Sequence, residues 1–264
     1  MLLLTATASR RGGVRHVMRL MSSLSFHELD SVESTQDEAR QLLSKTSTPY
    51  LAVSAKQQHK GRGTSGRVWK GLTGNVFLTV ALPFERVSVA VTLLPLQVGI
   101  IIAETLQKVL KDAGNQDDKL MLKWPNDVLI KREKVAGVLI ESHIAREQTF
   151  LLVGVGINIF EKPEIPSQEG RPAASIQEYC SEQLPDTTPH LIATDIANRL
   201  VEWMEDSSGH DVVETWKLWA EFNTKQTLRD TGEVVVPVNI ERDGQLLVRQ
   251  ENGEQRLLIA DYLY

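Results

Sequence analysis

The middle of this chain consists of short strand-like runs, and no other feature limits its possible folds as strongly. Alternating or uninterrupted apolar residues predict strands at Tyr50–Ala55, Asn75–Leu82, Leu120–Trp124, Val128–Ile130, Val135–Glu141 and Phe150–Ile157. Between the second and third of these, Leu94–Ala113 has the length and period of a buried helix that ends at Gly114. The pattern predicts an α+β domain in which helices flank a sheet.

Helices are also expected before and after these strands. Ser34 offers a capping hydroxyl with an acid, Asp37, three residues later, so a helix should start there and run through Leu43. Two more amphipathic helices fit Leu191–Met204 and Val212–Phe222.

The last forty or so residues have a different character. They contain three short β-like runs separated by hairpin dipeptides: Val234–Ile240, Asp243-Gly244, Gln245–Arg249, Asn252-Gly253 and Gln255–Ile259. A β region of this size cannot bury much apolar surface by itself. We therefore expect it to dock on the main domain.

Composition narrows the function classes. A net charge of -5 and a pI near 5.7 disfavour a general binder of nucleic acids or anionic membranes. No run reaches the roughly 18 uninterrupted apolar residues that a membrane-spanning helix needs, since the candidate Val89–Ala103 is too short and contains Pro95. Cys180 is the only cysteine, so neither an intrachain disulfide nor a cysteine framework for zinc can form.

The first 24 residues carry four arginines and no acid precedes Glu28. This composition is typical of an organelle-import presequence, although a disordered tail or initiation at Met21 would explain it as well. We expect a targeting or disordered segment at 1–24, a main domain at 25–222 and a small β domain at 223–264. The expected location is cytoplasmic or mitochondrial.

A basic, glycine-rich segment lies between two predicted strands. From Lys56 to Lys70 the chain holds five Lys or Arg and no acid, and Gly61, Gly63 and Gly66 are interspersed with arginines. Glycines allow the backbone N–H groups to approach a ligand, and arginine binds phosphate or carboxylate in a bidentate manner. The segment favours an anion-binding loop, while a solvated turn and an RNA-contacting segment remain open.

A second segment, Lys123-Trp124-Pro125-Asn126-Asp127, is followed by Lys134 at the start of another strand. This order would place two ammonium groups close together at the rim of the sheet. Asn126 and Asp127 could offer oxygen ligands to Mg²⁺. The simpler alternative is a Pro-Asn-Asp turn with solvent-facing lysines. Farther on, Gly154–Asn158 would permit close approach of a ligand or of neighbouring backbone.

Together these residues resemble the biotin–protein ligase (holocarboxylase synthetase) family, of the monofunctional type without a DNA-binding domain. Gln58–Trp69 is similar to its Gln-x-x-Gly-Arg-Gly-x-x-Gly-Arg-x-Trp loop, and Lys123–Asp127 to its Lys-Trp-Pro-Asn-Asp motif. Lys134–Glu141 resembles its Lys-x-x-Gly-x-x-x-Glu strand. The resemblance implies a mixed sheet flanked by helices, like the catalytic domain of biotinyl and lipoyl synthetases and of class II aminoacyl-tRNA synthetases, with a small SH3-like C-terminal domain.

The resemblance also implies an activity. A ligase of this type forms biotinyl-5′-AMP and pyrophosphate from biotin and MgATP, and then joins biotin through an amide bond to a lysine in the acceptor domain of a carboxylase. It uses ATP and Mg²⁺ with no tightly bound prosthetic group. Such a protein would be a monomer or homodimer that binds neither nucleic acid nor membrane.

The resemblance also implies residue roles, since Ser34-Thr35 and Gly154–Asn158 fall at the family's remaining motif positions in the same order. The catalytic residues would be Lys134, Arg62 and Arg67. The biotin-binding residues would be Ser34, Thr35, Gln36, Gln58, Arg62, Gly63, Thr64, Lys134 and Gly137. The ATP- or adenylate-binding residues would be Gly61, Arg62, Gly66, Arg67, Trp69, Lys123, Asn126, Asp127 and Asn158, with Asp127 also a ligand for Mg²⁺.

Two positions depart from the family pattern: Gln36 stands where many members have Asn, and Thr64 where bacterial members often have Arg. A lipoate or octanoate ligase of the same fold is the nearest alternative. The Arg-Gly loop and the Lys-Trp-Pro-Asn-Asp motif favour biotin. Transferases of the related group use a cysteine nucleophile, which Cys180, outside every motif, does not resemble. An RNA-binding module is a further alternative, but the low aromatic content and the negative net charge disfavour it.

Overall fold

A computed structural model describes residues 24–87, 89–165, 171–206, 211–228 and 231–259. Residues 1–23, on which the predicted presequence falls, lie outside this range. The described chain forms a seven-stranded sheet with the strand order β1-β2-β5-β9-β8-β7-β6. Its strands are β1 (Leu24–Val32), β2 (Tyr50–Gln58), β5 (Val76–Pro83), β6 (Leu120–Lys123), β7 (Asp127–Ile130), β8 (Glu133–Ala145) and β9 (Gln148–Ile157).

The sheet is mixed, as expected. β1 and β2 pair in parallel, from Leu24↔Tyr50 onward, and the other pairs are antiparallel. Helix α2 (Thr35–Leu43) makes the crossover that two consecutive parallel strands require. All six predicted strands are present, and β1 is an additional edge strand. Polar residues such as His27 and Glu28 interrupt its apolar pattern.

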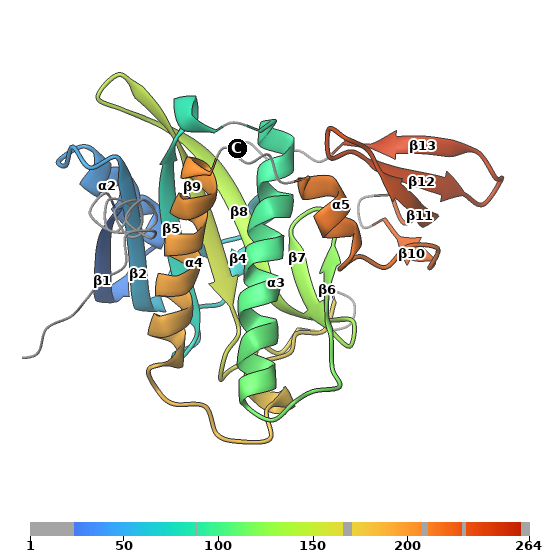
Figure 1. The fold of residues 1–264 in the computed structure, drawn as a ribbon, viewed down its shortest axis with the longest axis horizontal. Coiled ribbons are helices and arrows are strands. Elements are labelled where there is room, and N and C mark those ends of the chain that lie inside the picture. The colour runs from blue at the N-terminus through green and yellow to red at the C-terminus, as the bar shows by residue number, and fades with distance from the viewer. Residues whose placement is uncertain (1–23, 88, 166–170, 207–210, 229–230, 260–264) are drawn as a thin grey trace, which may run out of the picture.

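Apolar clusters cover both faces of the sheet. Alternate residues of a strand point to opposite faces, and in β2 Tyr50 belongs to the larger cluster while Leu51 belongs to the smaller one beneath α2. Helices α3 (Leu94–Asp112) and α4 (Thr188–Glu205) lie side by side over the larger cluster (Figure 1). Two helices on one face and one on the other confirm the predicted flanked sheet.

Helix α3 accounts for the most apolar part of the chain. Val91–Asp112 is long and apolar enough to span a membrane, but 78% of its most apolar window is buried inside the protein. Packing against α4 and the sheet explains this composition, since a helix that is apolar on most sides belongs in a core.

The helix predicted at Val212–Phe222 is wrong in its length. Helix α5 spans only Val212–Lys217. Beyond it the Trp219 carbonyl accepts a hydrogen bond from the Leu122 N–H at 2.9 Å, and Ala220 bridges to Leu122 in parallel. The backbone after Lys217 therefore pairs with the edge strand β6 instead of continuing the helix.

A second sheet at the C-terminal end contains β10 (Gln226–Thr227), β11 (Val234–Ile240), β12 (Leu246–Gln250) and β13 (Gln255–Leu258). Gly244 and Gly253 have φ of 85° and 87°, which confirms both hairpin predictions. The sheet docks on the main domain, because Trp124 Nε1 donates to the Gly244 carbonyl at 2.9 Å and Thr92 Oγ1 to the Asp243 carbonyl at 2.6 Å.

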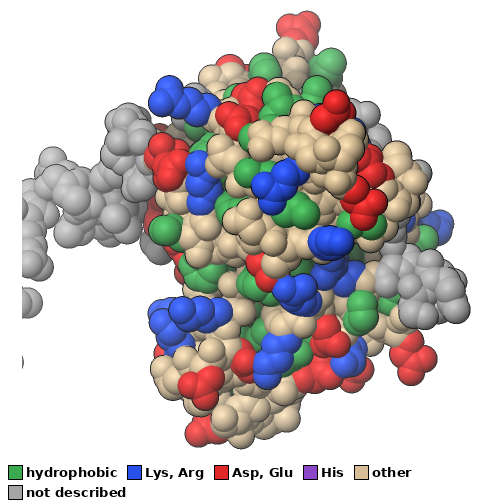
Figure 2. Space-filling view, turned by 90° about the vertical axis from the view of Figure 1, so that its right-hand side faces the viewer, with side chains coloured by type: hydrophobic (Ala, Val, Ile, Leu, Met, Phe, Trp, Pro, Cys, Tyr) green, Lys and Arg blue, Asp and Glu red, His purple; other side chains and the backbone are tan. Residues whose placement is uncertain are grey.

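The end of the molecule that includes this small sheet carries Lys and Arg interspersed with Asp and Glu (Figure 2). Neither sign of charge occupies this face alone.

Candidate active site

A cavity of about 930 Å³ brings the predicted site residues together. It is lined by the Arg-Gly loop, by the β6–β7 turn, by the glycines of β8 and β9 and by residues preceding β10. Of the predicted residues it includes Ser34, Thr35, Gln36, Gln58, Arg62, Gly63, Thr64, Arg67, Trp69, Lys123, Asn126, Asp127, Lys134, Gly137 and Asn158. Gly61 and Gly66 belong to the same loop but do not line the cavity.

One end of the cavity is formed by buried polar side chains, which we call the polar cluster: Ser34, Thr35, Gln36 and Gln58. The Thr35 N–H and hydroxyl both donate to Gln58 Oε1, at 2.9 and 3.2 Å. The buried Thr79 hydroxyl in turn donates to Thr35 Oγ1 at 2.9 Å. Sequence analysis missed Thr79, because a threonine within the predicted strand Asn75–Leu82 is an ordinary β-branched strand residue. These bonds fix the cluster before any ligand binds.

Gln36 leaves one of its polar atoms unused. Its Nε2 donates to the Leu139 carbonyl at 3.1 Å and lies 3.5 Å from that of Leu152. Its Oε1 is buried, and no described residue donates to it. An unpaired buried acceptor is unfavourable by about 1–3 kcal/mol. A ligand N–H that donates to Gln36 Oε1 would remove this penalty.

Ser34 precedes α2 but does not cap it in the predicted way. Its side chain makes no capping hydrogen bond. Asp37, the acid of the predicted capping box, accepts two hydrogen bonds from the Arg62 guanidinium at 2.8 and 2.9 Å. The buried Ser34 hydroxyl is therefore not used by the helix end.

Arg62 is bound to acidic side chains. Besides the bidentate pair with Asp37, it approaches Glu141 Oε2 at 3.4 Å, and Arg40 contacts the same two carboxylates at 2.6 and 2.9 Å. Hydrogen bonding to Arg62 lowers the pKa of Asp37 against the opposing effect of burial. This arrangement ties the Arg-Gly loop to α2 and β8, so the predicted binding of a substrate anion by Arg62 remains a prediction. Sequence analysis missed Asp37 and Arg40 as partners, since neither lies in the loop.

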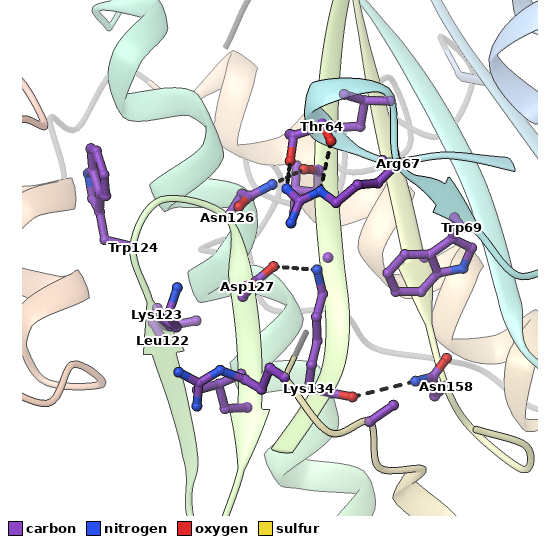
Figure 3. Close-up of a pocket in the computed structure, with 18 of the residues that line it drawn as sticks. Thr64, Arg67, Trp69, Leu122, Lys123, Trp124, Asn126, Asp127, Lys134 and Asn158 are labelled. Carbon is purple, nitrogen blue, oxygen red and sulfur yellow. Dashed lines mark hydrogen bonds and ion pairs between the residues drawn. The ribbon is translucent and has the colours of Figure 1, made fainter. Parts of the chain in front are cut away.

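The rest of the loop curls over the cavity. Ser65 and Gly66 have φ of 58° and 72°, a region that glycine adopts without strain. The Arg67 guanidinium folds back on Thr64, where Nε donates to the carbonyl at 2.9 Å and Nη2 contacts the hydroxyl (Figure 3). Thr64 therefore holds Arg67 at the rim of the cavity.

Trp69 lies against the glycines of the sheet. A Cβ at Gly156 would come within 2.7 Å of its indole nitrogen, and one at Gly137 within 3.1 Å of the ring. Lys134 Nζ lies 5.4 Å from the ring centroid, within cation–π range. The indole N–H is buried and no described residue accepts it. Only glycine at 156 leaves room for the ring, a second reason for that residue besides ligand approach.

Lys134 occupies the centre of the cavity. Its Nζ forms an ion pair with Asp127 Oδ1 at 2.5 Å, and Lys123 extends from β6, where it is paired with Asp127 of β7 (Figure 3). Burial opposes ionisation of Asp127, but Lys134 and Lys123 outweigh it and lower the pKa of this carboxyl. Burial, together with the charges of Arg171, Lys134 and Arg67, lowers the pKa of Lys123 although Asp127 opposes the shift. The two predicted ammonium groups thus share one cationic site.

Two predicted ATP ligands use their amides within the protein. Asn126 Nδ2 donates to the Val138 carbonyl at 2.7 Å, and the Val138 N–H donates back to the Asn126 carbonyl at 3.0 Å. Asn158 is 2% exposed and donates to the Ala174 carbonyl at 3.1 Å. Both side chains line the cavity, yet these bonds position backbone, so their contact with a nucleotide remains a prediction.

The donor set disfavours a resident metal ion. No group of three or more His, Cys, Asp or Glu that could hold a metal occurs in the part of the chain that the structure describes. Asp127 is paired with Lys134 and faces further cations, which would repel Mg²⁺. Magnesium typically uses one or two carboxylates together with substrate phosphates, so any Mg²⁺ here would arrive with a nucleotide as part of the substrate.

The sequence is similar to one known family. The sequence model of the biotin/lipoate A/B protein ligase family matches residues 28–158. A biotin–[acetyl-CoA-carboxylase] ligase of Paracoccus denitrificans is 33% identical over 156 residues, which cover 56% of this chain and 61% of that protein. The bifunctional ligase/repressor BirA of Bacillus subtilis is 29% identical over 158 residues, 59% of this chain and 47% of BirA. The chain spans about half the length of the curated relatives it matches.

Solved structures agree over a longer range. The biotin protein ligase of Leishmania major in complex with biotin has a TM-score of 0.66 and 28% identity, covering 89% of this chain and 98% of that one. The Aquifex aeolicus biotin protein ligase in complex with biotin and ATP has a TM-score of 0.68 at 23% identity, covering 91% and 97%. The second likeness supports the fold, including a mixed sheet flanked by helices.

Proposed function

Since the chain belongs to the biotin/lipoate A/B protein ligase family, we propose that it is a biotin–protein ligase that forms biotinyl-5′-AMP from biotin and ATP and transfers biotin to a lysine of a carboxylase acceptor domain. The observation that carries the proposal is one cavity that joins the polar cluster, with its unpartnered Gln36 Oε1, to the cationic site around Lys134. Biotin has a urea group at one end and a carboxylate at the other, and each end matches one part of this cavity.

The polar cluster suits a urea. Gln36 Oε1 would accept a urea N–H, and the Ser34 hydroxyl, which lines the same cavity and is not used to cap α2, would donate to the urea oxygen. Leu78, Leu139 and Val155 supply apolar walls nearby for the fused rings. Gln36 is longer than the asparagine of many family members, and Gly154 makes room for it, because a Cβ there would lie 2.5 Å from Gln36 Nε2.

The cationic site suits the first chemical step. The biotin carboxylate and the ATP α-phosphate are both anionic, so their approach needs positive charge between them. Lys134 would exchange its bond to Asp127 for the two reacting groups. A carboxylate oxygen then bonds to the α-phosphorus, the bond from phosphorus to the β-phosphate oxygen breaks, and its electron pair leaves with pyrophosphate. Trp69 would border the nucleotide.

The second step transfers the biotinyl group. The uncharged amine of an acceptor lysine attacks the carbonyl carbon of the mixed anhydride, AMP leaves with the electron pair of the C–O bond, and one proton is released. Water would compete for the same carbon. The loop from Gly61 to Arg67, tied to α2 through Arg62 and Asp37, would cover the intermediate and limit this hydrolysis.

Lipoate is the competing substrate within the family, and the polar cluster disfavours it. The dithiolane ring of lipoate has no N–H, so Gln36 Oε1 would stay unpaired on binding. Sites built to bond a polar group reject an analogue that lacks it by large factors.

We expect biotin to support pyrophosphate release from MgATP at least about 100-fold better than lipoate, because lipoate leaves buried polar groups unpaired. The assay follows pyrophosphate with each acid, and then transfer of radiolabelled biotin to an acceptor domain. Equal release with both acids would overturn the choice of biotin.

Thr64→Arg should slow the escape of biotinyl-5′-AMP by about three- to tenfold, because a second guanidinium beside Arg67 adds a charge-assisted contact to the phosphate. Thr64→Val is the matched control, since it removes the hydroxyl that holds Arg67 and adds no charge. Release is measured by chasing preformed labelled adenylate at two salt concentrations. The same release rate in Thr64→Arg and the wild type would contradict the covering role of the loop.

A further inference from the structure

The cavity contains more positive charge than the proposed adenylation centre explains. Its lining includes eight Lys or Arg side chains and three carboxylates. Three of the cations are paired: Arg62 with Asp37, Lys134 with Asp127, and Arg132 with Glu221. The other five have no ion-pair partner among the described residues: Arg67, Lys70, Lys123, Arg171 and Lys225. Of these, Arg171 lies close to Lys134 along the fold and in none of the motifs that sequence analysis singled out.

Arg171 is held in place by backbone. Its Nη1 donates to the Arg132 carbonyl at 2.8 Å, at the turn between β7 and β8. The next residue, Pro172, accepts a hydrogen bond from the Lys134 N–H at 2.8 Å, and the Ala174 N–H donates to the Lys134 carbonyl at 3.0 Å. The segment that carries Arg171 is therefore fastened alongside Lys134, which limits how far the guanidinium can move away from the cavity.

Arg171 also lies near the other cations of the site. Its charge is among those that lower the pKa of Lys123, together with Lys134 and Arg67. Like charges gathered in a half-buried cavity repel one another unless an anion binds among them. After one guanidinium nitrogen bonds the Arg132 carbonyl, the remaining N–H groups of Arg171 stay available for a phosphate, which arginine binds at two points.

We propose that Arg171 binds the β- and γ-phosphates of ATP and stabilises the pyrophosphate that leaves. The inference rests on the proposed function. When the carboxylate oxygen bonds to the α-phosphorus, the breaking P–O bond passes its electron pair to the β-phosphate, so negative charge grows on the leaving group. Lys134 contacts the carboxylate and the α-phosphate that react, whereas Arg171 contacts the pyrophosphate that leaves.

The test compares binding of three anions to the whole protein: inorganic pyrophosphate, ATP and AMP. Arg171→Ala should weaken pyrophosphate binding about 10- to 100-fold, the effect of one charge-assisted bidentate contact. Binding of AMP, which lacks the distal phosphates, should be unchanged. Arg171→Lys should recover part of the affinity, because lysine keeps the charge and loses the bidentate geometry.

Arg249→Ala is the matched control, since Arg249 is exposed on β12, outside this cavity, and its loss changes the net charge equally. Pyrophosphate affinity that is the same in Arg171→Ala and the wild type would overturn the proposal, as would a parallel loss of AMP binding. Pyrophosphate binding is measured without biotin. Failure of the wild type to catalyse biotin-dependent exchange of pyrophosphate into ATP would refute the proposed function and leave the test of Arg171 intact.

Discussion

Replacing Lys134 by alanine should slow formation of biotinyl-5′-AMP by about 10³-fold. The expected size is that of removing one preorganised group that stabilises charge in the transition state. Lys134 Nζ lies in the cavity between Asp127 Oδ1, at 2.5 Å, and the Trp69 ring, whose centroid is 5.4 Å away. The measurement is single-turnover adenylate formation at saturating biotin and ATP, so that weaker substrate binding does not enter the rate.

The same substitution should also lower stability, contrary to what a solvent-facing lysine would predict. The Lys134 and Asp127 side chains are 23% and 18% exposed, and alanine would leave the carboxylate without its ion pair. We expect a loss of about 1–3 kcal/mol in the free energy of unfolding, below the range for fully buried pairs. The double variant Lys134→Ala/Asp127→Asn removes the unpaired charge and should recover part of this loss without recovering activity.

The pH dependence of stability provides an independent check. The folded-state pKa of Asp127 lies below its ordinary value of 3.8, so its ionised form stabilises the fold above that value. This stabilisation is lost as the pH falls from 3.8 through the lowered pKa. In Lys134→Ala the decline should weaken, because the main favourable charge is gone.

Lys119→Ala serves as the control, since Lys119 is exposed and lies outside the cavity. It should retain both activity and stability. Wild-type rates of adenylate formation in Lys134→Ala would remove Lys134 from the catalytic centre.

The fold was predictable from the sequence where all residues of a segment are buried to a similar extent. Strands such as Phe150–Ile157 are buried along most of their length, so their apolar runs identify them. β1 was not predicted, because an edge strand is only partly covered and tolerates polar residues. The end of α5 depended on pairing between Trp219 and Leu122, which lie far apart in the sequence. No local pattern records a contact of that kind.

The site was predictable as a set of residues and less so as a set of bonds. The motifs located the cavity lining, but they did not show that Arg62 is paired with Asp37 or that Asn158 holds backbone. Those partners come from other elements and have ordinary local sequences. Arg171 is the clearest case, because its own hydrogen bond to the Arg132 carbonyl and those of residues 172 and 174 to Lys134 bring it to the cavity.

Substitutions at two glycines of β9 should affect the two substrates separately, because each glycine lies beside a different part of the cavity. Residues 154 and 156 point to the same face of the sheet. A Cβ at 154 would lie 2.5 Å from Gln36 Nε2, whereas one at 156 would lie 2.7 Å from the Trp69 indole nitrogen. Gly154→Ala should therefore raise the KM for biotin by about 10- to 100-fold, and Gly156→Ala the KM for ATP by a similar factor, the usual effect of overpacking.

Each variant controls for the other, because both add one methyl group to the same strand. Gly99→Ala in α3 is a further control, since Gly99 does not line the cavity and its added Cβ would meet Leu122, which does, at an ordinary 3.4 Å. Steady-state kinetics with each substrate varied in turn gives both constants. If both β9 variants raised both KM values equally, biotin and ATP would not be recognised by separate side chains. The assignment of Gln36 to biotin and of Trp69 to the nucleotide would then be wrong.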